Sequence, residues 1–433
     1  MKIKIPRKIN IAIAAGILGL SNSAGAQENS DKLNVGVFTF LSGPAAAYGE
    51  PGRRGAETII DMINSDGGIE GRTIEANYID EAQGTEGVIT EYRQLANDPN
   101  YNVMIAALSS SNCLALISVA DQLKMPTIGW NCDTHQLYAN NNSEYFYRPN
   151  GSTIAEFVSY AAYLSKVNPN AERIAIINPD YSFGHDAAEI FISAMKAFNP
   201  DVEVVAELYP KLGASSYQTE ISRLSSARPD VIFSNLWGGD LENFLRQAAP
   251  RRLLQTSQAV LALGESVLQS IDLPDGIIVG VLGDGLWMSP DAQSNPRTVD
   301  FVEKYHKEYG GYPTFPAMKM ANSFMVMEEA VKSAMEDNGG TWPTREEIAV
   351  AMEGLQVETL TGEVNFRSDN EGLVDQIVGM TASSDKYDFP IISNMIRFEG
   401  DVMYSPQGED PLGWVKSLGP DFLAKLPEPG SYN

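Results

Sequence analysis

Runs of apolar residues alternate with segments of helical periodicity along the first third of the chain. Residues 33–41 (LNVGVFTFL) predict a buried strand, and residues 56–63 then place apolar side chains at the i, i+3, i+4, i+7 spacing of one helix face. Gly67 and Gly68 are expected to end this helix, because glycine readily adopts the left-handed conformation of a helix C-cap. The pattern continues with predicted strands at 73–79, 103–108 and 126–130, and with predicted helices around 88–95 and from Ser110.

The same alternation starts again after Asn150. It predicts helices at 154–164, 186–198, 217–226 and 241–249, and strands at 173–178, 202–208 and 231–235. A third set, with a strand at 277–282 and helices at 298–309, 317–335 and 345–352, could complete either sheet. Short apolar stretches follow at 376–381 and 391–398, and the tail 404–433 is typical of a wrapping segment. Two doubly wound α/β lobes accommodate this order most simply.

Length and charge narrow the range of partners. The chain has 433 residues, well above the roughly 150 residues of a single domain, so two packed cores are expected. Its net charge of −25 repels phosphate backbones and anionic lipids, which argues against nucleic acid as a partner. A hydrophobic content of 43% is ordinary for a folded protein, so the acidity is expected on a solvated surface.

The first 26 residues have the three-part pattern of a secretory signal. A basic start at 2–8 leads into the apolar run 9–20, and small residues at 24–26 precede Gln27. The apolar run is too short for a membrane anchor, which needs about 20 residues. We therefore expect cleavage after Ala26 and a freely diffusing periplasmic protein without a lipid anchor.

Cys113 and Cys132 are the two cysteines of the sequence. In an oxidising compartment an even number of cysteines favours a disulfide, which here would close a short loop. Two unpaired, partly buried thiols are the alternative, because the sequence does not report the distance between the two Cα atoms.

Motifs of the common enzyme and metal sites are missing. The three histidines, at positions 135, 185 and 306, are not spaced as a helical metal pair. There is no phosphate-binding P-loop, no nucleophile elbow, no paired C-x-x-C and no calcium loop. We therefore expect a protein that is not an enzyme and that holds no cofactor and no metal.

Candidate binding residues follow the predicted strands, where open α/β sheets bind their ligands. Tyr48 lies in the small-residue loop after the first strand and could form a flat wall with a polar tip, unless that loop is simply exposed. Ser110 and Ser111 open a predicted helix, whose free N–H groups suit a carboxylate. Serine also caps many helices that bind nothing.

Three further loops offer candidates. Asn131, Cys132 and Asp133 follow the strand at 126–130, and Asp133 could pair with an ammonium group or cap the next helix. Phe183 and Trp237 follow two strands of the second half, where aromatic side chains could cover the carbon skeleton of a ligand or belong to the core.

Several of these stretches resemble one known family. The motifs are LSGPAAAYG (41–49), INSDGGIEGR (63–72), SSS (109–111), YFYR (145–148) and NPDYSFG (178–184). They are similar to type I periplasmic substrate-binding proteins of ABC importers, in the leucine/isoleucine/valine-binding group. The similarity runs through most of the chain after the signal, although the C-terminal tail is longer than the family leads us to expect.

The resemblance implies a Venus-flytrap fold of two lobes joined by three crossing segments, near Arg148, Gly280 and Ser368. The implied N-terminal lobe comprises residues 27–148 and 281–368. The implied C-terminal lobe comprises residues 149–280 and 369–433, including the extended tail.

Carried over residue by residue, the resemblance places Ser110 and Ser111 at the ligand carboxylate and Asn131, Cys132 and Asp133 at the amino-acid head. It places Tyr48, Phe183 and Trp237 in the aromatic walls. Two departures concern the α-ammonium group, which an acid of the second lobe usually holds. Glu265 is the candidate there, whereas Asp133 stands where the family has serine, threonine or alanine. Either the acid that binds the α-ammonium group comes from the first lobe instead of the second, or the pocket takes a different small molecule.

These observations lead to one main hypothesis and three alternatives. The main hypothesis is a monomeric periplasmic receptor that binds a hydrophobic or branched-chain amino acid, or a related small carboxylate, and delivers it to an ABC permease. The same fold could bind an aromatic acid, a short amide or urea, or could act as a ligand sensor for a membrane receptor. An enzyme on this scaffold is the third possibility, because a fold does not fix a function.

Overall fold

The first lobe is built on a five-stranded parallel sheet of order β2-β1-β3-β4-β5. The computed structural model describes residues 31–139 and 143–433, so the predicted signal peptide lies outside the described residues. The strands are β1 (Lys32–Thr39), β2 (Thr73–Asp80), β3 (Tyr101–Ile105), β4 (Thr127–Ile128) and β5 (Phe146–Tyr147).

Alternate residues of the central strands enter two different cores. Val35 and Val37 of β1 belong to one hydrophobic cluster, whereas Phe38 belongs to a second cluster on the other face. This is the period of two that a strand imposes on its side chains. Both faces of the sheet are therefore covered by helices, which explains why the strands read as nearly continuous apolar runs.

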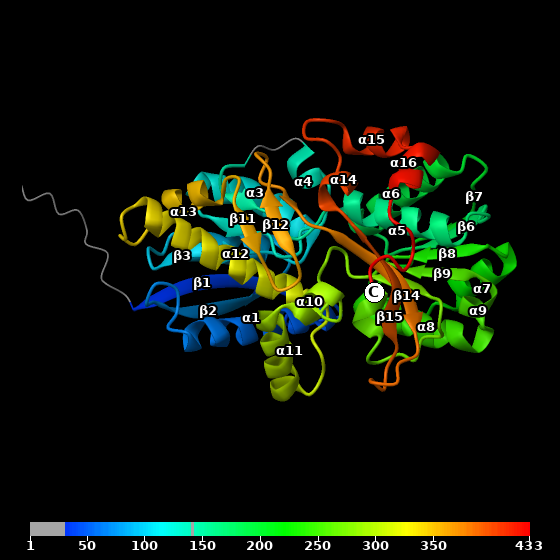
Figure 1. Cartoon of the computed structure of the whole chain (residues 1–433), viewed down its shortest axis with the longest axis horizontal. Coiled ribbons are helices and arrows are strands. Elements are labelled where there is room, and N and C mark those ends of the chain that lie inside the picture. Colours follow the sequence, from blue (N-terminus) through cyan, green and yellow to red (C-terminus); the bar gives the residue numbers. More distant parts are fainter. Residues whose placement is uncertain (1–30, 140–142) are drawn as a thin grey trace, which may run out of the picture.

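The helices that cover this sheet come from two distant parts of the sequence (Figure 1). Helix α1 packs against α12, whereas α2 packs against α3. At the crossing of α1 and α12, a Cβ atom on Gly55 would lie 2.3 Å from the carbonyl oxygen of Ala317, so the two helices approach each other too closely for a side chain there. The helices from the first part of the chain are α1 (Ala46–Ser65), α2 (Thr85–Ala96), α3 (Ser110–Leu123) and α4 (Gln136–Ala139), and the later ones are α10 (Pro290–Ser294), α11 (Pro296–Tyr309), α12 (Phe315–Asp337) and α13 (Arg345–Met352).

The second lobe contains a seven-stranded sheet of order β15-β14-β10-β9-β8-β6-β7. Its first five strands in the sequence pair in parallel. The two last strands come from the end of the chain, where β14 pairs antiparallel with β10 and β15 pairs antiparallel with β14. The strands are β6 (Arg173–Ile177), β7 (Glu203–Leu208), β8 (Val231–Ser234), β9 (Gln258–Leu261), β10 (Ile278–Gly280), β14 (Gln376–Ala382) and β15 (Ile391–Phe398).

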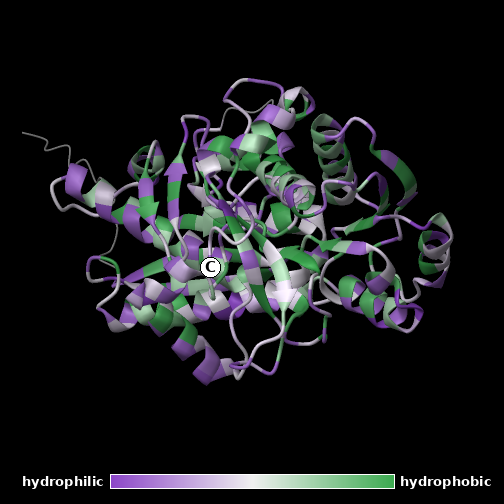
Figure 2. Cartoon of the chain, turned by 45° about the vertical axis from the view of Figure 1, so that its right-hand side comes forward, coloured by the Kyte–Doolittle hydropathy of each residue, from purple (hydrophilic) through white to green (hydrophobic). Residues whose placement is uncertain are grey.

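Helices and the tail cover the second sheet. Hydrophobic segments concentrate in the strands and the inner faces of the helices, whereas hydrophilic segments lie mainly at the periphery (Figure 2). The covering helices are α5 (Thr153–Val167), α6 (Ser182–Phe198), α7 (Gln218–Ala227), α8 (Gly238–Ala248) and α9 (Leu253–Thr256). The tail helix α15 packs on α5 and α6, and α16 packs on α6, as predicted for a wrapping segment. The tail helices are α14 (Gly400–Met403), α15 (Pro411–Ser417) and α16 (Pro420–Lys425).

Three stretches of chain run side by side between the two large sheets. The N–H of Gly372 donates to the carbonyl of Arg148 over 2.7 Å, and the N–H of Ile377 donates to the carbonyl of Gly283 over 2.9 Å. The Arg148 guanidinium is fully buried and pairs with Glu371. Beside this region lies a small antiparallel sheet of β11 (Gln356–Glu358), β12 (Glu363–Phe366) and β13 (Gly372–Leu373).

The predicted two-lobed α/β architecture is confirmed, with differences in detail. Gly67 and Gly68 have positive φ angles and end α1, as expected. The expected strand at 126–130 is reduced to the two residues of β4, because the chain turns into the loop that begins at Gly129. Strands β5 and β9 and helix α4 carry no periodicity long enough to predict them. The third set divides between the lobes, with β10 in the second sheet and α11 to α13 on the first.

Candidate functional site

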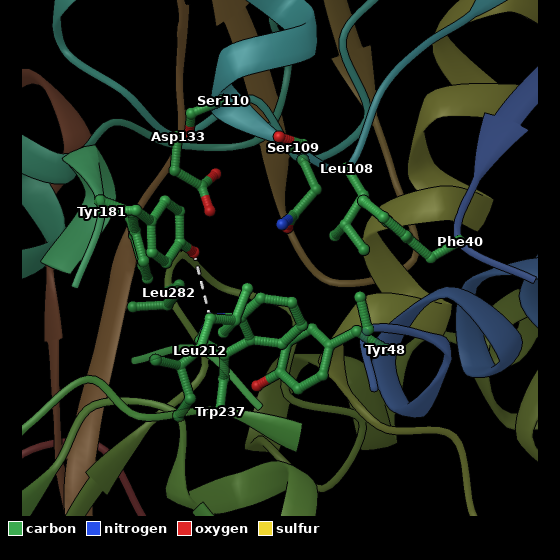
Figure 3. A pocket seen from close by; sticks show the side chains of 14 residues that line it. Phe40, Tyr48, Leu108, Ser109, Ser110, Asp133, Tyr181, Leu212, Trp237 and Leu282 are labelled. Atoms are coloured by element: carbon green, nitrogen blue, oxygen red, sulfur yellow. Dashed lines mark hydrogen bonds between the residues drawn. The ribbon is translucent and has the colours of Figure 1, made fainter. Parts of the chain in front are cut away.

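A cavity of about 250 Å³ lies between the two lobes, at the carboxyl ends of the strands (Figure 3). Its walls are mostly apolar and aromatic, and Asp133 is the only charged side chain among the described residues that line it. The first lobe contributes Phe40, Ala45, Tyr48, Leu108, Ser109, Ser110, Asn131 and Asp133. The opposite wall consists of Tyr181, Phe183, Leu212, Trp237, Leu263 and Leu282. An apolar cavity with a few polar groups at one end is typical of a small-molecule site.

The N-terminus of α3 forms the polar end of the cavity. Ser109 is the N-cap residue, but its hydroxyl makes no capping hydrogen bond and instead lines the cavity with Ser110. Ser111 is exposed to solvent and does not line the cavity. Because a helix N-terminus carries partial positive charge, the two lining hydroxyls stand where an anionic group is favoured.

Glu81 occupies the other side of this helix start. Its buried carboxylate accepts hydrogen bonds from the N–H groups of Leu108 (2.7 Å) and Ser109 (3.3 Å) and from the side chain of Asn112 (2.7 Å). Burial raises the pKa of Glu81 to about 7, against the opposing effect of these donors. Glu81 thus satisfies the N–H groups of the N-cap residue Ser109 and of Leu108 before it, and the sequence pattern gave no sign of this contact.

A disulfide fixes the loop after β4 to α3. Cys113 and Cys132 are bonded with their Cα atoms 6.0 Å apart, which confirms the predicted pairing. The Arg148 guanidinium donates to the carbonyls of Cys132 (2.6 Å) and Thr134 (2.5 Å), and so holds the same loop from the side of the crossing segments. The loop that carries Asn131 and Asp133 is therefore restrained at several points.

Asp133 forms a buried ion pair that the sequence did not indicate. Its Oδ1 lies 3.1 Å from Nζ of Lys319, a residue of α12 that is itself almost fully buried. Asp133 does not cap α4; the hydroxyl of Thr134 accepts from the N–H of Gln136 instead. Burial raises the pKa of Asp133, and Lys319 opposes this shift.

A third ionisable group, Glu156 of α5, lies beside this pair. One of its carboxyl oxygens is 3.8 Å from Lys319 Nζ, and neither oxygen has a hydrogen-bond partner among the described residues. Burial, reinforced by the negative charge of Asp133, raises the pKa of Glu156 well above its ordinary value. This buried position therefore favours the neutral form of Glu156.

Aromatic side chains from both lobes meet across the cavity. Tyr48 lies in the first turn of α1 and is buried, so the alternative of an exposed loop is wrong. Its ring makes an edge contact with Trp237 at 5.3 Å, and its hydroxyl donates to Ser266 of the second lobe over 3.2 Å. Trp237 Nε1 donates to the hydroxyl of Tyr181 over 3.1 Å, the dashed line of Figure 3.

Glu265 does not line the cavity. Its carboxylate accepts from the N–H of Phe315, the first residue of α12, over 3.1 Å, and so joins the two lobes. Burial raises the pKa of Glu265 to about 8, although the hydrogen bond from Phe315 acts in the other direction.

The structure thus brings most of the predicted binding residues to one place. Tyr48, Ser110, Asn131, Asp133, Phe183 and Trp237 line the cavity, whereas Ser111, Cys132 and Glu265 do not. Lys319 was missed, although a lysine inside the apolar run FPAMKMANSFMVM is a signal that could have revealed a buried ion pair. Tyr181 also lines the cavity, from the same loop as Phe183.

The described residues contain neither a candidate membrane-spanning helix nor a candidate metal cluster. None of their helices is long and apolar enough to cross a membrane. Within the same ranges, no group of three or more His, Cys, Asp or Glu side chains could hold a metal ion.

Comparison with solved structures shows the same fold. A solute-binding protein of an ABC transporter from Rhodopseudomonas palustris BisB5, in complex with 3,4-dihydroxybenzoic acid, matches with a TM-score of 0.70 at 21% identity, covering 86% of this chain and 98% of that one. A branched-chain amino acid transporter substrate-binding protein from Streptococcus pneumoniae, in complex with isoleucine, matches with a TM-score of 0.71 at 18% identity, covering 85% and 99%.

Sequence comparison shows the family. Leu/Ile/Val-binding protein homolog 4 from Brucella melitensis is 24% identical over 386 residues, covering 86% of this chain and 88% of that protein. The family model described as periplasmic binding protein matches residues 32–386, which include both sheets up to β14 and every residue that lines the cavity. The chain belongs to the periplasmic binding protein family.

Proposed function

We propose that this protein is the periplasmic receptor of an ABC importer, and that it clamps a small apolar carboxylate between its lobes and delivers it to a membrane permease. The solute class comprises hydrophobic and branched-chain amino acids and related small carboxylates. The observation that carries the proposal is the cavity itself, which has apolar and aromatic walls from both lobes and the start of α3 at one end.

The chemistry of the lining supports a ligand with one anionic end and a carbon skeleton. The hydroxyls of Ser109 and Ser110 can donate to a carboxylate at the helix start, where the helix dipole favours negative charge. The rings of Tyr48 and Trp237 can cover the carbon skeleton and exclude water. Isoleucine and 3,4-dihydroxybenzoic acid, the ligands of two structural neighbours, both join a carboxylate to an apolar body.

The arrangement of the lobes supports a clamp. We assign residues 27–148 and 281–368 to the first lobe and residues 149–280 and 369–433 to the second, with crossings near Arg148, Gly280 and Ser368. A ligand that contacts both lobes stabilises the closed form over the open one. Such a clamp needs no second copy of the chain and no catalytic group, in keeping with a monomeric binding protein that is not an enzyme.

Location and partner follow from the same proposal. Residues 1–26 would direct export and be removed after Ala26, which leaves the receptor in the periplasm. The closed receptor would then dock on the membrane subunits of an importer. The family match to periplasmic binding proteins supports this location.

A thermal unfolding screen tests the proposal. The protein is freed of bound solute by dialysis from mild denaturant and heated with hydrophobic amino acids, aromatic and aliphatic acids, short amides and urea. A ligand at 100 times its dissociation constant stabilises the native state by about 2.7 kcal/mol, which gives a measurable rise in Tm.

We expect the rise with small apolar carboxylates and no rise with amides or urea. A response to amides or urea alone would contradict the proposed ligand class. Chemical conversion of the bound solute would contradict a binding role, whereas recovery of the unchanged solute is the expected result.

A further inference from the structure

We propose that Lys319 sets the specificity of the cavity by neutralising Asp133, so that the protein selects carboxylates that lack an α-ammonium group. This inference rests on the proposed function and deepens it. It divides the proposed solute class in two and assigns the choice between them to a residue that does not itself line the cavity.

The first step is the position of Asp133. Within the part of the chain that the structure describes, it is the only charged side chain that lines the cavity, and its carboxylate points into the cavity in Figure 3. An amino acid bound with its carboxylate at Ser109 and Ser110 would need a counter-charge for its ammonium group, because a buried charge without a partner is strongly disfavoured. Asp133 is the only lining residue that could supply it.

The second step is that Asp133 already has such a partner. Lys319 Nζ lies 3.1 Å from Asp133 Oδ1, and the side chains of both residues are at most 4% exposed. Lys319 cannot swing into solvent from this position, since it belongs to the long buried face of α12. The negative charge of Asp133 is thus balanced inside the protein before a ligand enters.

The third step concerns the other acids near the cavity. Glu156 lies 3.8 Å from Lys319 and does not line the cavity. Burial and the charge of Asp133 raise its pKa well above the ordinary value, which favours its neutral form. Glu265 accepts from Phe315, and burial raises its pKa to about 8. Glu371 pairs with Arg148. None of them is left to balance an incoming ammonium group.

The remaining polar groups of the lining are neutral. They are the hydroxyls of Tyr48, Tyr181, Ser109 and Ser110, the amide of Asn131 and the indole N–H of Trp237. Asn131 Oδ1 is buried and has no hydrogen-bond partner among the described residues, yet a neutral amide cannot offset a positive charge. A carboxylate without an ammonium group needs no such counter-charge, because the partial positive charge at the start of α3 stabilises its negative charge.

The test compares ligands that differ only in the ammonium group. The affinity of the solute-free protein is measured by calorimetry for L-leucine and 4-methylpentanoate, and for L-phenylalanine and 3-phenylpropanoate. We expect each amine-free acid to bind at least about tenfold more tightly than its amino acid, the size of one charge-assisted hydrogen bond.

The variant Lys319→Met tests the role of the lysine directly. It leaves Asp133 without its internal partner, so the ligand ammonium group becomes the available counter-charge. The ratio of the two affinities should move toward the amino acid by about 10- to 100-fold. Lys332→Met is the matched control, since Lys332 lies on the same helix and pairs with Glu328 near the surface, away from the cavity.

A double variant keeps the test valid if Lys319→Met does not fold. Lys319→Met with Asp133→Asn removes both charges together, and it should retain the preference of the unmodified protein for the amine-free acids. Equal or tighter binding of the amino acids by the unmodified protein would overturn this inference and leave the proposed function standing. An unchanged ratio in Lys319→Met would overturn the role of Lys319. If no carboxylate binds at all, the proposed function fails as well.

Discussion

At the scale of single residues, the two neighbouring serines at the start of α3 have different surroundings. Ser110 lines the cavity, whereas the side chain of Ser111 faces solvent. The sequence SSS could not separate them, because consecutive residues at a helix start differ by about 100° around the axis and the direction of the cavity is set by the other lobe.

Single substitutions separate the two serines. Ser110→Ala removes one donor to the ligand carboxylate and should weaken binding by about 1.5–3 kcal/mol, the value of a hydrogen bond to a charged group. Ser111→Ala keeps its backbone N–H and should change the affinity less than twofold, or about 0.4 kcal/mol. Calorimetry with the tightest carboxylate of the screen measures both, and equal losses in the two variants would contradict this placement.

At this scale, the sequence predicts which residues form the site but not which residues they interact with. The types of residue at the site were predictable, since they follow strands that the apolar runs identify. Their partners were not, because Asp133 and Lys319 are 186 residues apart and meet only when α12 packs onto the first lobe. The contact of Glu81 with the start of α3 is hidden in the same way.

At the scale of elements, the disulfide joins two parts that both contribute to the cavity. Cys113 lies one turn into α3, and Cys132 lies between Asn131 and Asp133 in the loop after β4. Fixing one to the other keeps the serines of the helix and the polar residues of the loop in a constant relative position. The bond thus orders the site as well as the fold.

Replacing both cysteines by serine should therefore affect stability and binding together. For a loop of this length we expect a loss of about 3 kcal/mol in the free energy of unfolding, chiefly because the unfolded chain becomes less restricted. Urea denaturation of the variant and of the oxidised protein measures this loss, with the reduced protein as a second reference. Equal midpoints for the oxidised protein and the variant would show that packing alone holds the loop.

Long elements were easier to predict than short ones, for a physical reason. The apolar run of β1 and the periodic face of α1 each extend over several residues, so their patterns stand out. Strands β4 and β5 have two residues each, and their sheet partners rather than their own sequence define them. The division of the third set between the lobes depends on long-range packing that periodicity does not encode.

At the scale of the whole molecule, several contacts hold the lobes together across the cavity. Glu265 accepts from the N–H of Phe315, and the side chain of Gln269 exchanges two hydrogen bonds with the backbone of Tyr312. These contacts join the segment after β9 to the start of α12 and the residues just before it. The ionisation of Glu265 is therefore coupled to the contact between the lobes.

This coupling predicts a pH effect on stability. Because burial raises the pKa of Glu265 to about 8, folding favours the protonated form. The contribution of Glu265 to the free energy of unfolding is complete below the pKa of the unfolded chain, near 4.3, and is lost as the pH rises through about 8. Glu265→Gln stays neutral and can still accept from Phe315, so its stability relative to the unmodified protein should increase from pH 5 to pH 8, by at most about 1.4 kcal/mol per pH unit.

Urea denaturation of both proteins at several pH values measures this difference. Glu336→Gln, at an exposed position near the end of α12, serves as the control and should run parallel to the unmodified protein. Parallel curves for Glu265→Gln would show that the carboxyl group of Glu265 is ionised in the folded protein.

The buried pair of Asp133 and Lys319 has a consequence for how such a receptor can diverge. Loss of Lys319 alone leaves an uncompensated buried carboxylate, which costs about 3–5 kcal/mol. A ligand ammonium group can take the place of the lost lysine and restore part of that stability. The effects of substitutions at positions 133 and 319 are therefore epistatic. A receptor that has lost only Lys319 depends on a bound amino acid for part of its stability until position 133 changes too.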